Sequence, residues 1–122
     1  MTDIEINTAI SAACGWKPCE QCLRNGYKDQ WRPPSGDGCE HVSELPNYCH
    51  NLNMIWSAEE TLTEPQQDAF LDHLWDAIWL PVVAEYNPSN PTRAGKLWMM
   101  VHSTARQRAE AFLRTIGKWR DE

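Results

Sequence analysis

The sequence contains no apolar run long enough to span a bilayer, and its first residues lack the basic and apolar regions of a signal peptide. We therefore expect no membrane span and a location in the cytoplasm. In such a reducing compartment, the five cysteines favour metal binding over disulfides.

Catalytic motifs are also missing. The chain has no Gly-x-Ser-x-Gly nucleophile elbow, no phosphate-binding glycine loop and no His-Glu-x-x-His. Pro18-Cys19-Glu20-Gln21-Cys22 matches half of the zinc deaminase signature, but no histidine precedes residue 41 to supply the other half. A redox Cys-x-x-Cys normally lies between a buried strand and a helix, whereas this one precedes an Asn-Gly turn signal and a proline-rich loop. We expect a protein that acts by binding, not an enzyme.

Basic residues are scarce over most of the chain. Residues 1–90 carry four Lys or Arg against fourteen Asp or Glu, whereas residues 91–122 carry seven against three. An acidic body does not attract nucleic acid. We therefore expect no direct nucleic-acid binding, and the charge favours a basic protein partner.

The segment from Cys19 to His41 has the spacing of a zinc site. Cys19 and Cys22 are separated by two residues, and Cys39 and His41 follow on the far side of a short loop. Sulfur and imidazole ligands at such spacing suit tetrahedral Zn²⁺. Few large apolar residues lie in between, so this segment depends on a metal for its folding. We predict one structural zinc held by Cys19, Cys22, Cys39 and His41.

Two other residues are alternatives for the fourth ligand. His50 or Cys49 could replace His41, although Cys49 lies on an apolar helix face, which favours a place in the core. Cys14 lies on a similar stripe and is interpreted as a core thiol.

Helical periodicity and capping boxes predict most of the remaining structure. Thr2 with Glu5, Thr63 with Gln66, and Thr104 with Gln107 each predict a helix start, and Asn47 predicts another. The helix after Thr63 is apolar around more than half of its circumference, which predicts a central helix ending or kinking at Pro81. Asn90-Pro91 predicts a further start, while residues 82–86 and 97–101 fit either strand or helix. We expect one domain over residues 1–122, of helix-predominant α+β class. Four to five helices pack with a zinc-binding hairpin insertion at residues 17–45.

Carboxylates recur every four residues along the helix after Thr63. They follow Glu60 at Glu64, Asp68, Asp72 and Asp76. Like charges at this spacing repel each other and do not help the helix to form. Two interpretations stay open besides the absence of any role. In the first, the carboxylates are neutralised by basic residues of the last helix, namely Arg106, Arg108, Arg114 and Lys118. In the second, the four carboxylates of this helix form a partner-binding strip for a basic groove on another protein.

Three blocks of the sequence resemble small bacteriophage proteins of a family named for a phage α/β/α sandwich domain. They are TARQRAEAFLRTIGKW at residues 104–119, ACGW at residues 13–16, and LPNY with NLN at residues 45–48 and 51–53. The resemblance implies a phage origin, a host bacterial cytoplasm and, as an alternative fold, an α/β/α sandwich. The cysteine segment is not part of the family pattern.

A small acidic phage protein without catalytic motifs also resembles the proteins with which phages disable host defences. Inhibitors of Cas9 and related CRISPR effectors act purely by binding, and the nucleic-acid channel of Cas9 is positively charged. The resemblance implies an anti-CRISPR inhibitor of Cas9 or another CRISPR effector, which blocks DNA engagement through an acidic surface. The alternative is a zinc-stapled structural or regulatory phage protein without an anti-defence role.

Overall fold

The computed structural model describes residues 1–86 and 88–121 and is helix-predominant with one small sheet, as predicted for the α+β class. Within these residues the elements are α1 (Asp3–Ala13), β1 (Lys17–Pro18), α2 (Glu20–Arg24), β2 (Gln30–Arg32), β3 (Glu40–His41), the 3₁₀ turn η1 (Val42–Glu44), α3 (Leu52–Glu59), α4 (Glu64–Tyr86), α5 (Arg93–Val101) and α6 (Ala105–Thr115). No described helix is both long and apolar enough to cross a membrane.

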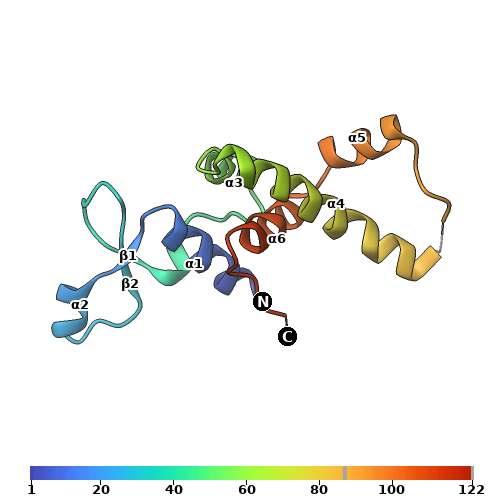
Figure 1. Cartoon of the computed structure of the whole chain (residues 1–122). Helices are drawn as coiled ribbons and strands as arrows, with labels where there is room; N and C mark the ends of the chain where they lie inside the picture. The colour runs from blue at the N-terminus through green and yellow to red at the C-terminus, as the bar shows by residue number, and fades with distance from the viewer. Residues whose placement is uncertain (87, 122) are drawn as a thin grey trace.

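Helix α6 lies at the centre of the helical body and packs against α1, α3 and α4 (Figure 1). Its Ala109 and Ala111 are completely buried, and their small side chains let neighbouring helices approach closely. Phe112 and Leu113 fill the remaining space against a core that includes Ile6 of α1. Burying each large side chain contributes about 1.5–3 kcal/mol, so this helix supplies much of the hydrophobic stabilisation.

The central position of α6 corrects the expectation for α4. The sequence predicted that α4 is the central helix, but several of its apolar side chains lie on the surface. Leu71 is 48% exposed and Leu80 is 60% exposed, while Trp75 and Trp79 stack on one another along its side at a centroid distance of 5.3 Å. Beyond the body, the C-terminal part of α4 projects to the right in Figure 1. The wide apolar face of α4 therefore serves both the core and the surface.

Three predicted capping boxes are present. The Thr2 hydroxyl accepts from the backbone N–H of Glu5 at 3.2 Å, and Thr104 does the same for Gln107 at 3.1 Å. Before α4, the backbone N–H of Thr63 donates to the Gln66 side chain at 2.9 Å, with a reciprocal contact of 3.4 Å. These local pairs satisfy N–H groups that have no partner within the helix.

Two predicted helix starts are wrong. Helix α3 is capped by Asn51, whose side chain accepts from two backbone N–H groups, whereas Asn47 accepts from the side chain of Asn7. Helix α5 is capped by Thr92, which accepts from the N–H of Gly95 at 3.1 Å, in place of Asn90. In both cases a second capping residue lies a few positions further along the chain.

The two ambiguous segments are both helical. Residues 82–86 form the last turns of α4, which continues through Pro81, and residues 97–101 belong to α5. A proline inside a helix removes one backbone hydrogen bond, here to the carbonyl of Ala77. Pro81 is exposed, so its ring displaces no core side chain.

The sheet lies at one end of the molecule, in a segment that we name the cysteine lobe (residues 17–41). Its strands are short and antiparallel in the order β1-β2-β3, with Lys17 opposite Arg32 and Gln30 opposite His41. Figure 1 shows this lobe projecting to the left of α1. The described residues therefore do not form the alternative α/β/α sandwich, because the sheet is not a layer between helices.

Candidate metal centre

Three cysteines of the cysteine lobe come together in space. The sulfur atoms of Cys19, Cys22 and Cys39 all lie within 4.8 Å of one another. Four ligands around Zn²⁺ at a Zn–S distance of about 2.3 Å are separated by about 3.8 Å from one another. The cysteine trio, as we call these three residues, is therefore positioned to bind a metal.

The local fold explains how the chain brings the three sulfurs together. Cys19 directly precedes α2 and Cys22 lies in its first turn, so a spacing of three residues puts both side chains on the same face of the helix. The predicted Asn-Gly hairpin turn instead ends this helix, with Gly26 at a φ of 85°. Such a positive φ favours glycine.

The third cysteine arrives through the sheet. The backbone N–H of Cys19 donates to the carbonyl of Gln30 at 2.8 Å, which ties the start of α2 to β2. The following loop turns back at Gly36 and Gly38, both at positive φ, and Cys39 directly precedes β3. Antiparallel pairing of β2 with β3 thus returns Cys39 to the other two cysteines.

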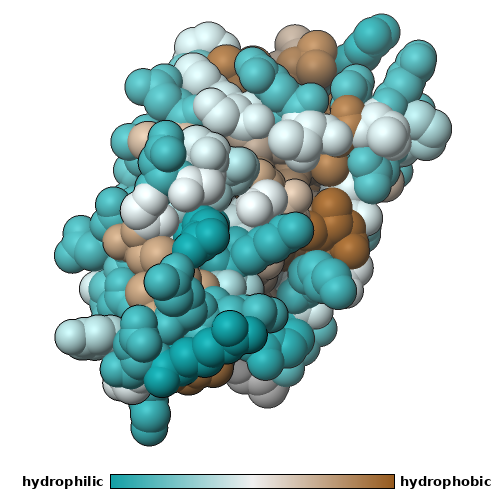
Figure 2. Space-filling model, turned by 90° about the vertical axis from the view of Figure 1, so that its left-hand side faces the viewer, coloured by the Kyte–Doolittle hydropathy of each residue, from teal (hydrophilic) through white to brown (hydrophobic). Residues whose placement is uncertain are grey.

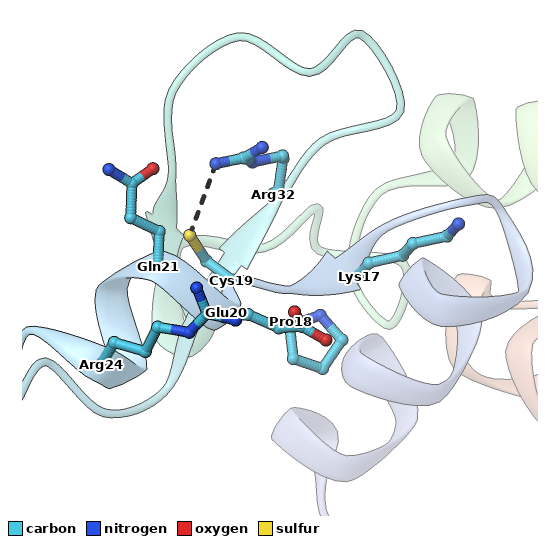
Figure 3. Close-up of a pocket in the computed structure, with 7 residues that line it drawn as sticks. All are labelled: Lys17, Pro18, Cys19, Glu20, Gln21, Arg24 and Arg32. Atoms are coloured by element: carbon cyan, nitrogen blue, oxygen red, sulfur yellow. Dashed lines mark hydrogen bonds between the residues drawn. The ribbon is translucent and has the colours of Figure 1, made fainter.

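Arg32 of β2 supplies positive charge to the trio. Its Nη2 atom lies 3.8 Å from the Cys19 sulfur (Figure 3). Hydrogen bonds from the Cys39 thiol, from the backbone N–H and thiol of Cys22, and from Arg32 lower the pKa of Cys19 to about 6. The Cys22 thiol donates to the Cys19 sulfur, and this hydrogen bond together with burial raises the pKa of Cys22 to about 11. The trio as a group therefore loses its first proton more readily than an isolated cysteine does, and thiolates are the form that binds metals.

The structure places His41 next to the trio but not within it. His41 Nδ1 lies 2.8 Å from the hydroxyl oxygen of Ser43 and accepts from the backbone N–H of the same residue at 3.2 Å. The side chain thereby caps η1. Three of the four predicted ligands are together, and the role of His41 as the fourth stays a prediction.

Neither alternative ligand joins the trio. His50 Nε2 lies 2.7 Å from a carboxylate oxygen of Asp3. Cys49 is 3% exposed and belongs to the hydrophobic core, and Cys14 packs against the same core. Burial raises the pKa of both thiols, to about 11 for Cys49. The two cysteines are core thiols, as predicted, although Cys49 lies in the turn before α3 and not on a helix face.

The four regularly spaced carboxylates of α4 are all exposed, and we name them the acidic strip. They are Glu64, Asp68, Asp72 and Asp76. Among the described residues, none of the four forms an ion pair. The arginines of α6 pair elsewhere, Arg106 with Asp3 and Arg108 with Glu59. Arg106 and Arg108 therefore form no ion pair with the strip, whereas Arg114 lines a cleft together with Asp76.

The position of Arg32 beside the trio was not predicted from the sequence. A signal for it was present, because all four Lys and Arg residues of positions 1–90 lie between residues 17 and 32. Three of them, Lys17, Arg24 and Arg32, line a cleft of about 550 Å³ beside Cys19. Figure 2 shows the end of the molecule from which the lobe projects, and that face is mostly hydrophilic. The lobe thus combines thiols that could hold a metal ion with local positive charge.

The local geometry of this chain thus places three cysteines where they could hold a metal ion. Comparisons with protein-family models, with curated proteins and with solved structures each found no match to the chain.

Proposed function

We propose that this chain is a zinc-stapled phage protein that acts by binding and inhibits a host CRISPR effector such as Cas9. The observation that carries the metal part is the approach of three cysteine sulfurs to within 4.8 Å of one another. Thiolate ligands select soft or borderline ions, and the Cys-x-x-Cys spacing suits zinc. His41, two residues after Cys39, provides the fourth ligand once it leaves Ser43.

The zinc has a structural role in this proposal. Of residues 17–41, all of which the structure describes, Cys19 alone is fully buried. Leu23 and Tyr27, the large apolar residues of the lobe's first half, are 63% and 66% exposed. A segment without a core of its own gains its folding free energy from the metal. Arg32 offsets part of the negative charge that several thiolates bring to one ion.

Partner binding is assigned to the acidic strip of α4. Its carboxylates are exposed and free of ion pairs with described residues, so their charge is available to an external basic surface. Attraction of this kind steers association and prevents binding to acidic surfaces. A positively charged nucleic-acid channel, as in Cas9, is such a surface. The alternative partner is a basic phage or host protein outside defence.

Elemental analysis of protein purified without added metal tests the zinc site. We expect about one zinc per chain, lost in Cys22→Ser and retained in the matched variant Cys14→Ser, whose thiol lies outside the trio. His41→Ala should bind Co²⁺ more weakly and with a changed absorption spectrum. An unchanged spectrum would assign the fourth position to another ligand. Metal-free protein with a fully protected cysteine lobe in hydrogen exchange would show that the lobe needs no metal.

Inhibition of a purified Cas9–guide complex tests the partner. The protein should reduce binding of target DNA, and Asp68→Asn with Asp72→Asn should weaken that effect, most strongly at low salt. Asp37→Asn removes one exposed carboxylate from the cysteine lobe and serves as the charge control. Unchanged DNA binding at saturating protein would contradict the Cas9 assignment and leave the zinc site standing.

A further inference from the structure

An apolar groove runs between α3, α4 and α5 beside the acidic strip. Its volume is about 520 Å³, and its lining includes Trp56 of α3, Leu71 of α4, and Leu97 and Val101 of α5. These four side chains are 47%, 48%, 54% and 74% exposed, respectively. Contiguous apolar surface of this kind commonly marks a site of interaction.

Part of the acidic strip borders this groove. Asp72 itself lines the groove, directly after Leu71. On a helix, residues three apart are separated by about 60° around the axis, so Asp68 lies beside Leu71 on the surface of α4. The apolar and acidic rows are therefore neighbours along the same helix. Together they form one continuous surface with an apolar part and an acidic part.

The two cations that line the groove are engaged within the protein. Arg108 Nη2 lies 2.6 Å from Oε1 of Glu59, and Lys96 Nζ lies 5.0 Å from the centroid of the Trp75 ring. Both contacts hold the charge against the body of the molecule. The carboxylates of Asp68 and Asp72 have no such partner among the described residues. The rim therefore carries two carboxylates without an ion-pair partner among the described residues, beside one lysine that lies against Trp75.

We propose that the groove binds a basic amphipathic helix of a protein partner. Grooves between helices accept a helix whose apolar side chains recur at positions i, i+3 or i+4, and i+7. The strip spans thirteen residues from Glu64 to Asp76, a rise of about 18 Å, which matches roughly three turns of a bound helix. Lysines or arginines on one flank of that helix then face the strip. This inference rests on the proposed function, in which the strip attracts a basic partner. It adds that the part of the partner bound in the groove is a helix.

The probe is a designed 18-residue peptide with leucines at helical spacing and lysines at the other positions. A scrambled peptide of the same composition removes the apolar face, and a third peptide carries glutamates in place of the lysines. Titration of each labelled peptide, followed by fluorescence anisotropy at two salt concentrations, measures binding. We expect the amphipathic lysine peptide to bind at least tenfold more tightly than either control.

Variants separate the groove from the strip. Leu97→Ser and Val101→Ser should each weaken peptide binding about tenfold, because both side chains face the groove and are largely exposed. If either α5 variant has a lower melting temperature, Trp56→Ala tests the α3 side of the groove independently. Ile4→Ser, at an apolar side chain of α1 that is 55% exposed, is the matched control and should bind as the parent does. Thermal melts verify that each variant is folded.

The outcomes distinguish this inference from the proposed function. Weak binding by Asp68→Asn with Asp72→Asn, together with full binding by all groove variants, overturns the helix groove and leaves the acidic strip as a contact surface. Full binding by every variant overturns both. Self-association in sedimentation that Val101→Ser abolishes, without peptide binding, assigns the groove to a second copy of this chain and also overturns the proposal.

Discussion

Asp3 joins three parts of the chain through one carboxylate. One oxygen lies 2.7 Å from His50 Nε2, in the turn before α3, and the other accepts from Arg106 of α6. The hydrogen bond from His50 lowers the pKa of Asp3 below its usual value of 3.8, and the positive charge of Arg106 acts in the same direction. Asp3 therefore stabilises the fold in its ionised form.

The pH dependence of stability should show this contribution. Because the pKa of Asp3 is lower in the folded state, its stabilisation is present above the unfolded pKa and is lost as pH falls through the folded value. The side chain is 44% exposed, so Asp3→Asn should cost only about 0.5 kcal/mol at neutral pH. Urea unfolding should show the difference at pH 7 and little of it near pH 2. A constant difference at both pH values would contradict the role of the charge.

At the scale of residues, a helix start was predictable where only one capping residue was available nearby. Thr2 with Glu5 and Thr104 with Gln107 start helices because a capping box needs only residues three positions apart. The predicted helix start at Asn47 was wrong, because Asn51 caps α3 and the Asn47 side chain accepts a hydrogen bond from Asn7. That contact joins residues forty positions apart, and no local pattern contains it.

At the scale of elements, α3 and α6 are held together by a largely buried ion pair. Arg108 donates to Glu59 through Nε at 2.9 Å and through Nη2 at 2.6 Å. The two side chains are 17% and 14% exposed, and the guanidinium also lies 5.7 Å from the centroid of the Phe70 ring. With both partners present, the cost of removing the charges from water is offset by two direct hydrogen bonds.

Breaking this pair should destabilise the protein strongly. Glu59→Ala leaves a guanidinium without its partner in a largely dry site, so we expect a loss of about 3 kcal/mol in the free energy of unfolding. Urea titration measures the loss. The control is Glu110→Ala, which removes a partner of Arg114 at 3.6 Å on the surface of α6 and should cost about 0.5 kcal/mol or less. Equal losses of unfolding free energy in the two variants would mean that the Glu59–Arg108 pair is as well solvated as the Glu110–Arg114 pair.

The cysteine lobe shows how a site can be predicted more accurately than the element that carries it. A hairpin insertion was predicted at residues 17–45, and the structure has a helical turn at Cys19 and Cys22 within it. Both conformations bring the sulfurs of a Cys-x-x-Cys together, so the spacing predicted the approach of these cysteines without the correct backbone. Arg32 was missed because it approaches Cys19 across the sheet.

At the scale of the whole molecule, the sequence predicted helix predominance but not the arrangement of the helices. Periodicity shows which face of a helix is apolar, and it does not identify what covers that face. The apolar surplus of α4 indicated a central helix, whereas Leu71 and other apolar side chains of α4 lie on the surface. The centre belongs to α6, whose alanines permit close packing against three neighbouring helices.

The place of α6 has a consequence for synthesis on the ribosome. The helix that fills the centre is the last of the described elements to be translated, and α1, which packs against it, is the first. The core of the body therefore stays open until α6 emerges from the exit tunnel. The cysteine trio is complete once residue 39 has emerged, and its contacts are local. If the trio holds a metal as proposed, a nascent chain can bind that metal before α6 is available to pack against the other helices.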